Sequence, residues 1–259
     1  MQYGIREMLM GADIALEEKF RRARELGFDG IELITRSAPH MHGMLAFDEA
    51  GRAELVALSD EFGVGISSLS LASWRDANCL TTDPDEWARG KTHLIEAIEA
   101  ATALGCAGIL LPHFQTMEPH LEDPRLEPDL RGIREAVEEA GNTEIVVCVE
   151  CTVGIETMQA VVEIAGHPQV GIYFDLGNLS STGRDPARMI RILGTRGVKM
   201  IHIKEAGAEL LGDGDVDLAA VRDAVHEIGY DGWLVFETAP TDDPMAAMRH
   251  NFAELRRFL

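Results

Sequence analysis

The sequence predicts an α/β protein of the (β/α)8 TIM-barrel class, and three observations lead to this prediction. Short apolar runs of strand length recur eight times along the 259 residues. Amphipathic helical stretches separate these runs, so that strand and helix alternate throughout. No G-x-G-x-x-G motif follows the first run, which argues against the alternative of an open, doubly wound sheet. Because no linker or low-complexity segment interrupts the alternation, we expect a single domain over residues 1–259.

The elements follow in order along the chain. The eight expected strands are residues 2–5, 29–34, 64–71, 107–112, 144–150, 170–175, 198–203 and 233–237. The clearest helical segments are residues 14–27, 86–105 and 218–229. Each of these three segments closes on a glycine, the residue that best tolerates the left-handed conformation of a helix C-cap.

The composition is ordinary for a globular protein, but the charge is not. Hydrophobic residues make up 46% and charged residues 26% of the chain, whereas the formal net charge is −21. We expect no nucleic-acid partner, because phosphate binding requires clustered Lys and Arg. We also expect no membrane span and a cytoplasmic location, since there is no apolar stretch of about 20 residues and no signal-peptide pattern. The C-x-x-C pair Cys148 and Cys151 lies in a strand, so we expect structural thiols that point to opposite faces.

Four consecutive strands carry a potential metal ligand near their carboxyl ends. Glu150, Asp175 and Glu237 end three of them, and His202 lies within the fourth. Any one of these residues alone would be an ordinary cap, turn or core residue, but four in phase predict a shared site on the face where barrels carry their chemistry. Three neighbouring carboxylates would repel one another without a cation. Three oxygen ligands and one imidazole favour Mn²⁺, Mg²⁺ or Co²⁺, with Zn²⁺ as a further candidate.

Other side chains near the strand ends are candidates for contact with a substrate. Lys204 lies two residues beyond His202, so strand alternation places it in the same mouth, where it would hold a phosphate or substrate oxygen or pair with an acid. His113 follows the fourth strand and Trp74 follows the third, and we expect both near the substrate. Glu32 ends the second strand, where hydrogen bonding behind the site is expected rather than substrate contact.

Two further motifs receive more limited interpretations. The segment G-D-G-D-V-D, residues 212–217, has the alternating aspartates of a calcium loop but lacks the required Gly and the final Glu. Asp217 is instead expected to be the N-cap of the helix 218–229. His40 and His42 have H-x-H spacing, but their loop offers no third ligand and they receive no role.

Four segments together resemble the xylose-isomerase-like barrel superfamily of sugar isomerases and epimerases, most of all the ketose 3-epimerases and pentulose-phosphate 3-epimerases. They are F-D-L-G-N, I-H-I-K-E, G-D-G-D-V-D and G-Y-D-G-W-L-V-F-E, and the similarity spans nearly the whole chain. The resemblance implies that Glu150, Asp175, His202 and Glu237 bind a divalent ion, with Glu150 and Glu237 also acting as acid and base. It further implies that Glu156 binds a substrate hydroxyl and that the protein forms a homo-oligomer.

Two positions depart from the pattern of this family. Asn178 stands where many members have a histidine, although sequences similar to the pentulose-phosphate epimerases share its D-x-G-N motif; we include Asn178 among the expected substrate-binding residues. Ala208 stands where the ketose 3-epimerases have a substrate-binding arginine, so their substrate contacts do not transfer.

The expected function is therefore a metal-dependent isomerase or epimerase of a ketose or other sugar derivative, phosphorylated or not. One glutamate would remove a proton beside the carbonyl and the other would return it, while the metal stabilises the enediolate. Two alternatives remain open: a dehydratase of an inosose- or dehydroshikimate-like keto-polyol, and a sugar-binding chain that depends on a partner subunit. Barrel relatives that cleave DNA at abasic sites are excluded, because only one histidine matches their zinc cluster and the chain is strongly acidic.

Overall fold

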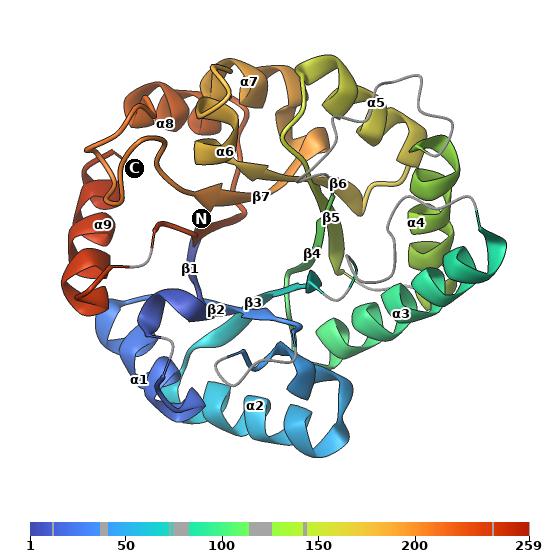
Figure 1. Ribbon diagram of the computed structural model, residues 1–259, viewed down its shortest axis with the longest axis horizontal. Coiled ribbons are helices and arrows are strands. Elements are labelled where there is room, and N and C mark those ends of the chain that lie inside the picture. Colours follow the sequence, from blue (N-terminus) through green and yellow to red (C-terminus); the bar gives the residue numbers. More distant parts are fainter. Residues whose placement is uncertain are drawn as a thin grey trace.

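The eight predicted strands close into one parallel barrel. The computed structural model describes residues 1–11, 13–36, 41–72, 74, 83–113, 126–141, 144–239 and 241–258. The strands pair in chain order from β1 to β8, and β1 also pairs with β8, which closes the ring. The helices surround the strands on the outside (Figure 1). The expected (β/α)8 architecture is confirmed.

The strands lie where the apolar runs predicted them. Their bounds are β1 Gln2–Arg6, β2 Gly30–Ile34, β3 Gly65–Ser70, β4 Gly108–Pro112, β5 Val146–Glu150, β6 Val170–Asp175, β7 Val198–Ile203 and β8 Trp233–Phe236. Glu237 lies one residue beyond β8 rather than inside it, although its backbone N–H still donates to the carbonyl oxygen of Ile203 at 3.0 Å.

The helix ends predicted from the sequence have the expected capping residues. Their bounds are η1 Glu7–Met10, α1 Leu16–Leu26, η2 Gly43–Phe47, α2 Glu49–Phe62, α3 Pro84–Ala103, α4 Leu126–Ala140, α5 Ile155–Ala165, α6 Leu176–Ser180, α7 Pro186–Gly197, α8 Leu218–Glu227 and α9 Pro244–Phe258. Asp217 caps α8 as expected, accepting the N–H of Ala220 at 2.9 Å. The glycines expected after α1, α3 and α8 all have left-handed φ values, between 66° and 86°. Among the helices described here, none combines the length and apolar character needed to cross a bilayer.

Strand alternation positions the candidate site. The barrel interior contains an apolar layer of Leu110, Cys148, Tyr173, Met200 and Val235. A side chain two positions further along a strand points to the same side, one layer nearer the carboxyl end. From Cys148, Tyr173, Met200 and Val235, this step leads to Glu150, Asp175, His202 and Glu237. The four candidate ligands therefore share one layer at the mouth of the barrel.

The two thiols of the C-x-x-C pair point into different parts of the core, as expected, although Cys151 lies one residue beyond β5. Cys148 belongs to the interior layer, whereas Cys151 belongs to the larger apolar cluster that includes the surrounding helices. Both thiols are buried and free, and each packs in a separate part of the core.

Candidate metal centre

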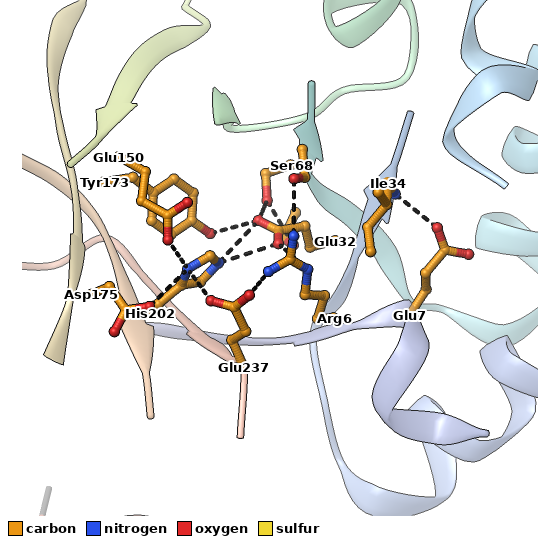
Figure 2. Close-up of polar contacts among 12 residues, drawn as sticks. Arg6, Glu7, Glu32, Ile34, Ser68, Glu150, Tyr173, Asp175, His202 and Glu237 are labelled. Carbon is orange, nitrogen blue, oxygen red and sulfur yellow. Dashed lines mark hydrogen bonds and ion pairs between the residues drawn. The ribbon is translucent and has the colours of Figure 1, made fainter. Parts of the chain in front are cut away.

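Four side chains from neighbouring strands converge at the mouth of the barrel. Glu150, Asp175, His202 and Glu237 each offer one potential ligand atom, and these four atoms all lie within 4.8 Å of one another. Nδ1 of His202 is 3.4 Å from Oε1 of Glu150, 3.9 Å from Oδ2 of Asp175 and 3.0 Å from Oε2 of Glu237. Figure 2 shows the three carboxylates around this side of the imidazole. The structure brings together the residues that the sequence grouped.

Two carboxylate oxygens of this cluster accept no hydrogen bond from the described residues, although His202 and Lys204 lie within ion-pair distance of both. They are Oδ2 of Asp175 and Oε2 of Glu237, and both are buried. The other oxygen of Asp175 accepts the backbone N–H of Asn178 at 2.7 Å, and the other oxygen of Glu237 forms an ion pair with Arg6. Burying a carboxylate oxygen that accepts no hydrogen bond is costly. A cation between these oxygens and the imidazole would remove that cost, so the donor set fits a divalent ion.

Lys204 lies beside the same two carboxylates. Its Nζ is 3.6 Å from Oδ2 of Asp175 and 3.8 Å from Oε2 of Glu237, so the side chain enters the mouth as strand alternation predicted. Burial raises the pKa of Asp175, and the positive charge of Lys204 offsets only part of that effect. The Lys204 side chain is partly exposed and can therefore also contact a bound molecule.

Glu32 lies against the opposite side of the His202 ring. Its Oε1 is 3.2 Å from Nε2 of His202 and 3.5 Å from Nε of Arg6. Its Oε2 accepts hydrogen bonds from Oη of Tyr173 at 2.9 Å and from Oγ of Ser68 at 2.8 Å. The Glu32 side chain is completely buried. The hydrogen bonds expected for Glu32 behind the site are present.

Contacts with oppositely charged neighbours change the pKa values of His202 and Glu32 more than burial does. Burial alone lowers the pKa of His202, but Glu32 and Glu150 raise that pKa to about 9. Burial alone raises the pKa of Glu32, but His202 and Arg6 bring it down to about 2. Without a bound cation, His202 is therefore an imidazolium that balances part of the carboxylate charge around it.

Arg6 is a site residue that sequence reasoning missed. It ends β1, and its guanidinium lies between Glu237 and Glu32, while its Nη2 donates to Oγ of Ser70 at 3.2 Å. The sequence signal that could have indicated Arg6 is its position. The prediction that polar residues at strand ends lie at the barrel mouth was applied only to the later strands, but Arg6 is also the last residue of a strand, and β1 is the neighbour of β8. Applying that prediction to all eight strands would have placed Arg6 at the mouth, although its pairing with Glu237 depends on β1 closing the barrel against β8.

Glu205 is a second missed residue, and it organises the acidic loop after β7. Its buried carboxylate accepts backbone N–H groups from Ala206 at 3.3 Å, Gly212 at 3.0 Å and Val216 at 3.2 Å. The loop is thus folded around an internal carboxylate. The aspartates of G-D-G-D-V-D do not belong to the candidate ion cluster.

The other expected substrate contacts lie outside the four-residue cluster. His113 is buried, and its Nε2 is 2.7 Å from Oδ2 of Asp129 in α4. Trp74 is buried with its ring centre 6.4 Å from that of His113. Glu156 is exposed in the first turn of α5, and Asn178 is half-buried in α6. The substrate-binding roles of these residues stay predictions.

His42 belongs to a separate buried cluster around Glu7. The Glu7 carboxylate lies 2.8 Å from Nδ1 of His42 and 3.4 Å from Nζ of Lys19, and it accepts the backbone N–H of Ile34 at 2.7 Å. This cluster ties the segment after β2 to η1. His40 lies outside the described residues.

Comparison with known proteins establishes the family. The model of the family described as xylose isomerase-like TIM barrel matches residues 20–258. The chain belongs to this family. Among its relatives is an Escherichia coli (strain K12) protein named "Putative L-ribulose-5-phosphate 3-epimerase SgbU", which is 27% identical over 253 residues. That alignment covers 91% of this chain and 88% of the relative, so the resemblance suggested by the four sequence segments is confirmed.

Solved structures share the fold over the whole chain. The D-allulose 3-epimerase from Methylomonas sp., solved in complex with D-allulose, has a TM-score of 0.82 at 18% identity, covering 100% of this chain and 97% of that one. The IOLI protein, solved with a zinc atom, has a TM-score of 0.78 at 14% identity, covering 100% of this chain and 96% of that one. At these identities the likeness establishes the fold alone.

Proposed function

We propose that this protein is a divalent-metal-dependent isomerase or epimerase of a ketose or related sugar derivative. The observation that carries the proposal is the convergence of four ligand atoms within 4.8 Å, in a cluster where one oxygen each of Asp175 and Glu237 is buried and accepts no hydrogen bond. The names of similar proteins support the substrate class, since they include an L-ribulose-5-phosphate 3-epimerase and a D-allulose 3-epimerase. By analogy with the family, we also propose a homo-oligomer, which light scattering would test.

Glu150, Asp175, His202 and Glu237 would hold the ion. The three oxygen donors and single nitrogen favour Mn²⁺, Mg²⁺ or Co²⁺, and the zinc in the IOLI protein keeps Zn²⁺ as a candidate. When bound, a divalent ion withdraws electron density from a carbonyl and stabilises the negative charge that develops when the neighbouring carbon loses its proton.

Glu150 and Glu237 are the proposed acid–base pair. Glu150 ends β5 and Glu237 follows β8, three strands further around the closed ring, so the two carboxylates would approach a sugar from different directions. If a proton taken by one glutamate returns to the opposite face of the same carbon, the carbon is inverted, as in an epimerase. If it returns to the adjacent carbon, an aldose and a ketose interconvert.

The remaining substrate contacts are proposed to orient the sugar. Lys204 presents a partly exposed ammonium at the mouth, where it would bind a sugar or phosphate oxygen. Glu156, Asn178, His113 and Trp74 complete the proposed substrate-binding set. Of these, His113 and Trp74 are buried, so their contribution would be to shape the wall of the pocket.

Dehydration of a keto-polyol is a second candidate, and the ion pair between Arg6 and Glu237 favours it. Oε1 of Glu237 is engaged by the guanidinium of Arg6, so only its Oε2 remains to face a substrate. A single carboxylate could remove the proton and then deliver it to the departing β-hydroxyl, which leaves as water, so dehydration needs one acid–base group rather than two opposed ones. A partner-dependent sugar-binding subunit is less well supported, because simple binding needs no acid–base pair.

Solvent exchange tests the proposal. The purified chain, supplied with Mn²⁺, is incubated in D₂O with a panel of ketoses and ketose phosphates, and products are analysed by mass spectrometry and absorbance. We expect deuterium at the carbon beside the carbonyl together with an epimer or an aldose, and Glu150→Gln should slow the exchange by about 10²-fold or more. Glu163→Gln, on the exposed face of α5, is the matched control and should exchange normally. A conjugated enone product would instead establish the dehydratase, and exchange that appears only after adding a partner chain would establish the subunit alternative.

A further inference from the structure

The two nitrogen atoms of His202 have different surroundings. Nδ1 faces the carboxylates of Glu150, Asp175 and Glu237, where the ion is proposed to bind. Nε2 faces the two oxygens of Glu32, at 3.2 Å and 3.4 Å, on the other side of the ring (Figure 2). Nδ1 can give a lone pair to an ion only if the ring proton is on Nε2. A carboxylate that accepts a hydrogen bond from Nε2 favours that tautomer and fixes the plane of the ring.

Glu32 is itself held in place by donors from two other strands. Tyr173 in β6 and Ser68 in β3 both donate to Oε2. Oε1 is thereby directed to His202 in β7 and to Arg6 in β1. The carboxylate is completely buried, so its orientation depends on these neighbours rather than on water.

The contacts of Glu32 extend to a second candidate ligand. The guanidinium of Arg6, 3.5 Å from Oε1 of Glu32, pairs with Oε1 of Glu237 and donates to Ser70. With one oxygen engaged in this way, Glu237 presents its Oε2 to Nδ1 of His202 at 3.0 Å. Glu32 therefore contacts His202 directly and reaches Glu237 through one intermediate residue.

We propose that Glu32 is a positioning residue that holds His202 with its Nε2 protonated and, through Arg6, orients Glu237 for ion binding. This inference rests on the proposed function and adds to it a group that contacts neither ion nor substrate. Glu32 acts from behind the site, because the imidazole of His202 lies between it and the carboxylates of Glu150 and Asp175, and Arg6 lies between it and Glu237.

Ion affinity tests the inference without any turnover. Isothermal titration calorimetry with Mg²⁺ or Mn²⁺ compares the unaltered chain with Glu32→Gln and Tyr173→Phe. We expect Glu32→Gln to weaken binding by about 10–100-fold. Tyr173→Phe changes no charge and removes one hydrogen bond to Glu32, so a loss of about 2–10-fold is expected. If Glu32→Gln does not fold, Tyr173→Phe and Ser68→Ala carry the test.

Glu7→Gln is the matched control for Glu32→Gln. Glu7 is an equally buried carboxylate, but its partners are Lys19, His42 and Ile34 rather than the candidate ligands. We expect this variant to bind the ion as the unaltered chain does. Equal losses of ion affinity in Glu7→Gln and Glu32→Gln would overturn the positioning role of Glu32. An unchanged ion affinity in Tyr173→Phe would overturn it as well.

A spectroscopic measurement examines the tautomer itself. In the Mg²⁺-loaded protein, nitrogen-correlated NMR should show an exchange-protected Nε2–H of His202, and Glu32→Gln should lose that protection. A proton on Nδ1 in the unaltered, loaded protein would contradict the inference. If the unaltered chain binds no divalent ion, the proposed function fails and this inference fails with it, whereas equal affinities of all variants would refute the inference alone.

Discussion

His202 contacts both the other candidate metal ligands and the buried carboxylate of Glu32 behind them. Its Nδ1 lies among three carboxylates and its Nε2 lies against a fourth, with no exposure of the ring to solvent. An imidazolium in this position stabilises the ion-free protein by balancing nearby negative charge. A bound divalent ion would take over this balancing role, so proton and ion compete for the same place.

The ion-free protein should therefore lose stability as the pH rises. The pKa of His202 is raised from 6.5 to about 9 on folding, so the folded state binds more protons than the unfolded state in this window. The stabilisation is fully present below about pH 6.5 and is lost as the pH rises through 9; its size is on the order of 3 kcal/mol. Urea unfolding in the presence of a chelator measures this trend, and His202→Asn should lack it. A free energy of unfolding that stays constant or increases between these pH values would contradict the assignment.

At the scale of elements, the junction between β6 and α6 delivers Asp175 to the site. Asp175 is the last residue of β6 and the N-cap of α6, where its Oδ1 accepts the N–H of Asn178. The glycine of F-D-L-G-N makes this junction possible. A Cβ at Gly177 would lie 2.4 Å from the carbonyl oxygen of Glu205 and 2.8 Å from Cγ of Lys204. The junction thus packs closely against the chain that follows β7.

Gly177→Ala should disturb both elements at once. The added methyl group meets backbone that cannot yield cheaply, so we expect a loss of about 1–3 kcal/mol in the free energy of unfolding. Gly65→Ala is the control, because a Cβ there would be 3.6 Å from its nearest neighbour, an ordinary contact. Chemical denaturation of the two variants gives the comparison. Equal stabilities would show that the close approach at Gly177 does not constrain the junction.

At the scale of the whole molecule, the sequence was most informative where the pattern was local. The eight strands follow from short apolar runs, and the four candidate ligands follow from strand alternation at the ends of β5 to β8. Arg6 was missed because its role depends on β1 closing the barrel against β8. Glu205 was missed because its partners are backbone N–H groups, and the residue types in the loop do not predict such contacts. The role of Arg6 thus depends on a contact between segments far apart in the sequence, and the role of Glu205 depends on backbone geometry.

The proposed function requires that a single cation be bound jointly by Glu150, Asp175, His202 and Glu237. Anomalous scattering from crystals of the full chain grown with Mn²⁺ tests it most directly. We expect one strong peak per chain at the barrel mouth, about 2.0–2.2 Å from Nδ1 of His202 and from one oxygen of each carboxylate. A mouth without a peak, or a peak only at another place such as the acidic loop of residues 212–217, would contradict it.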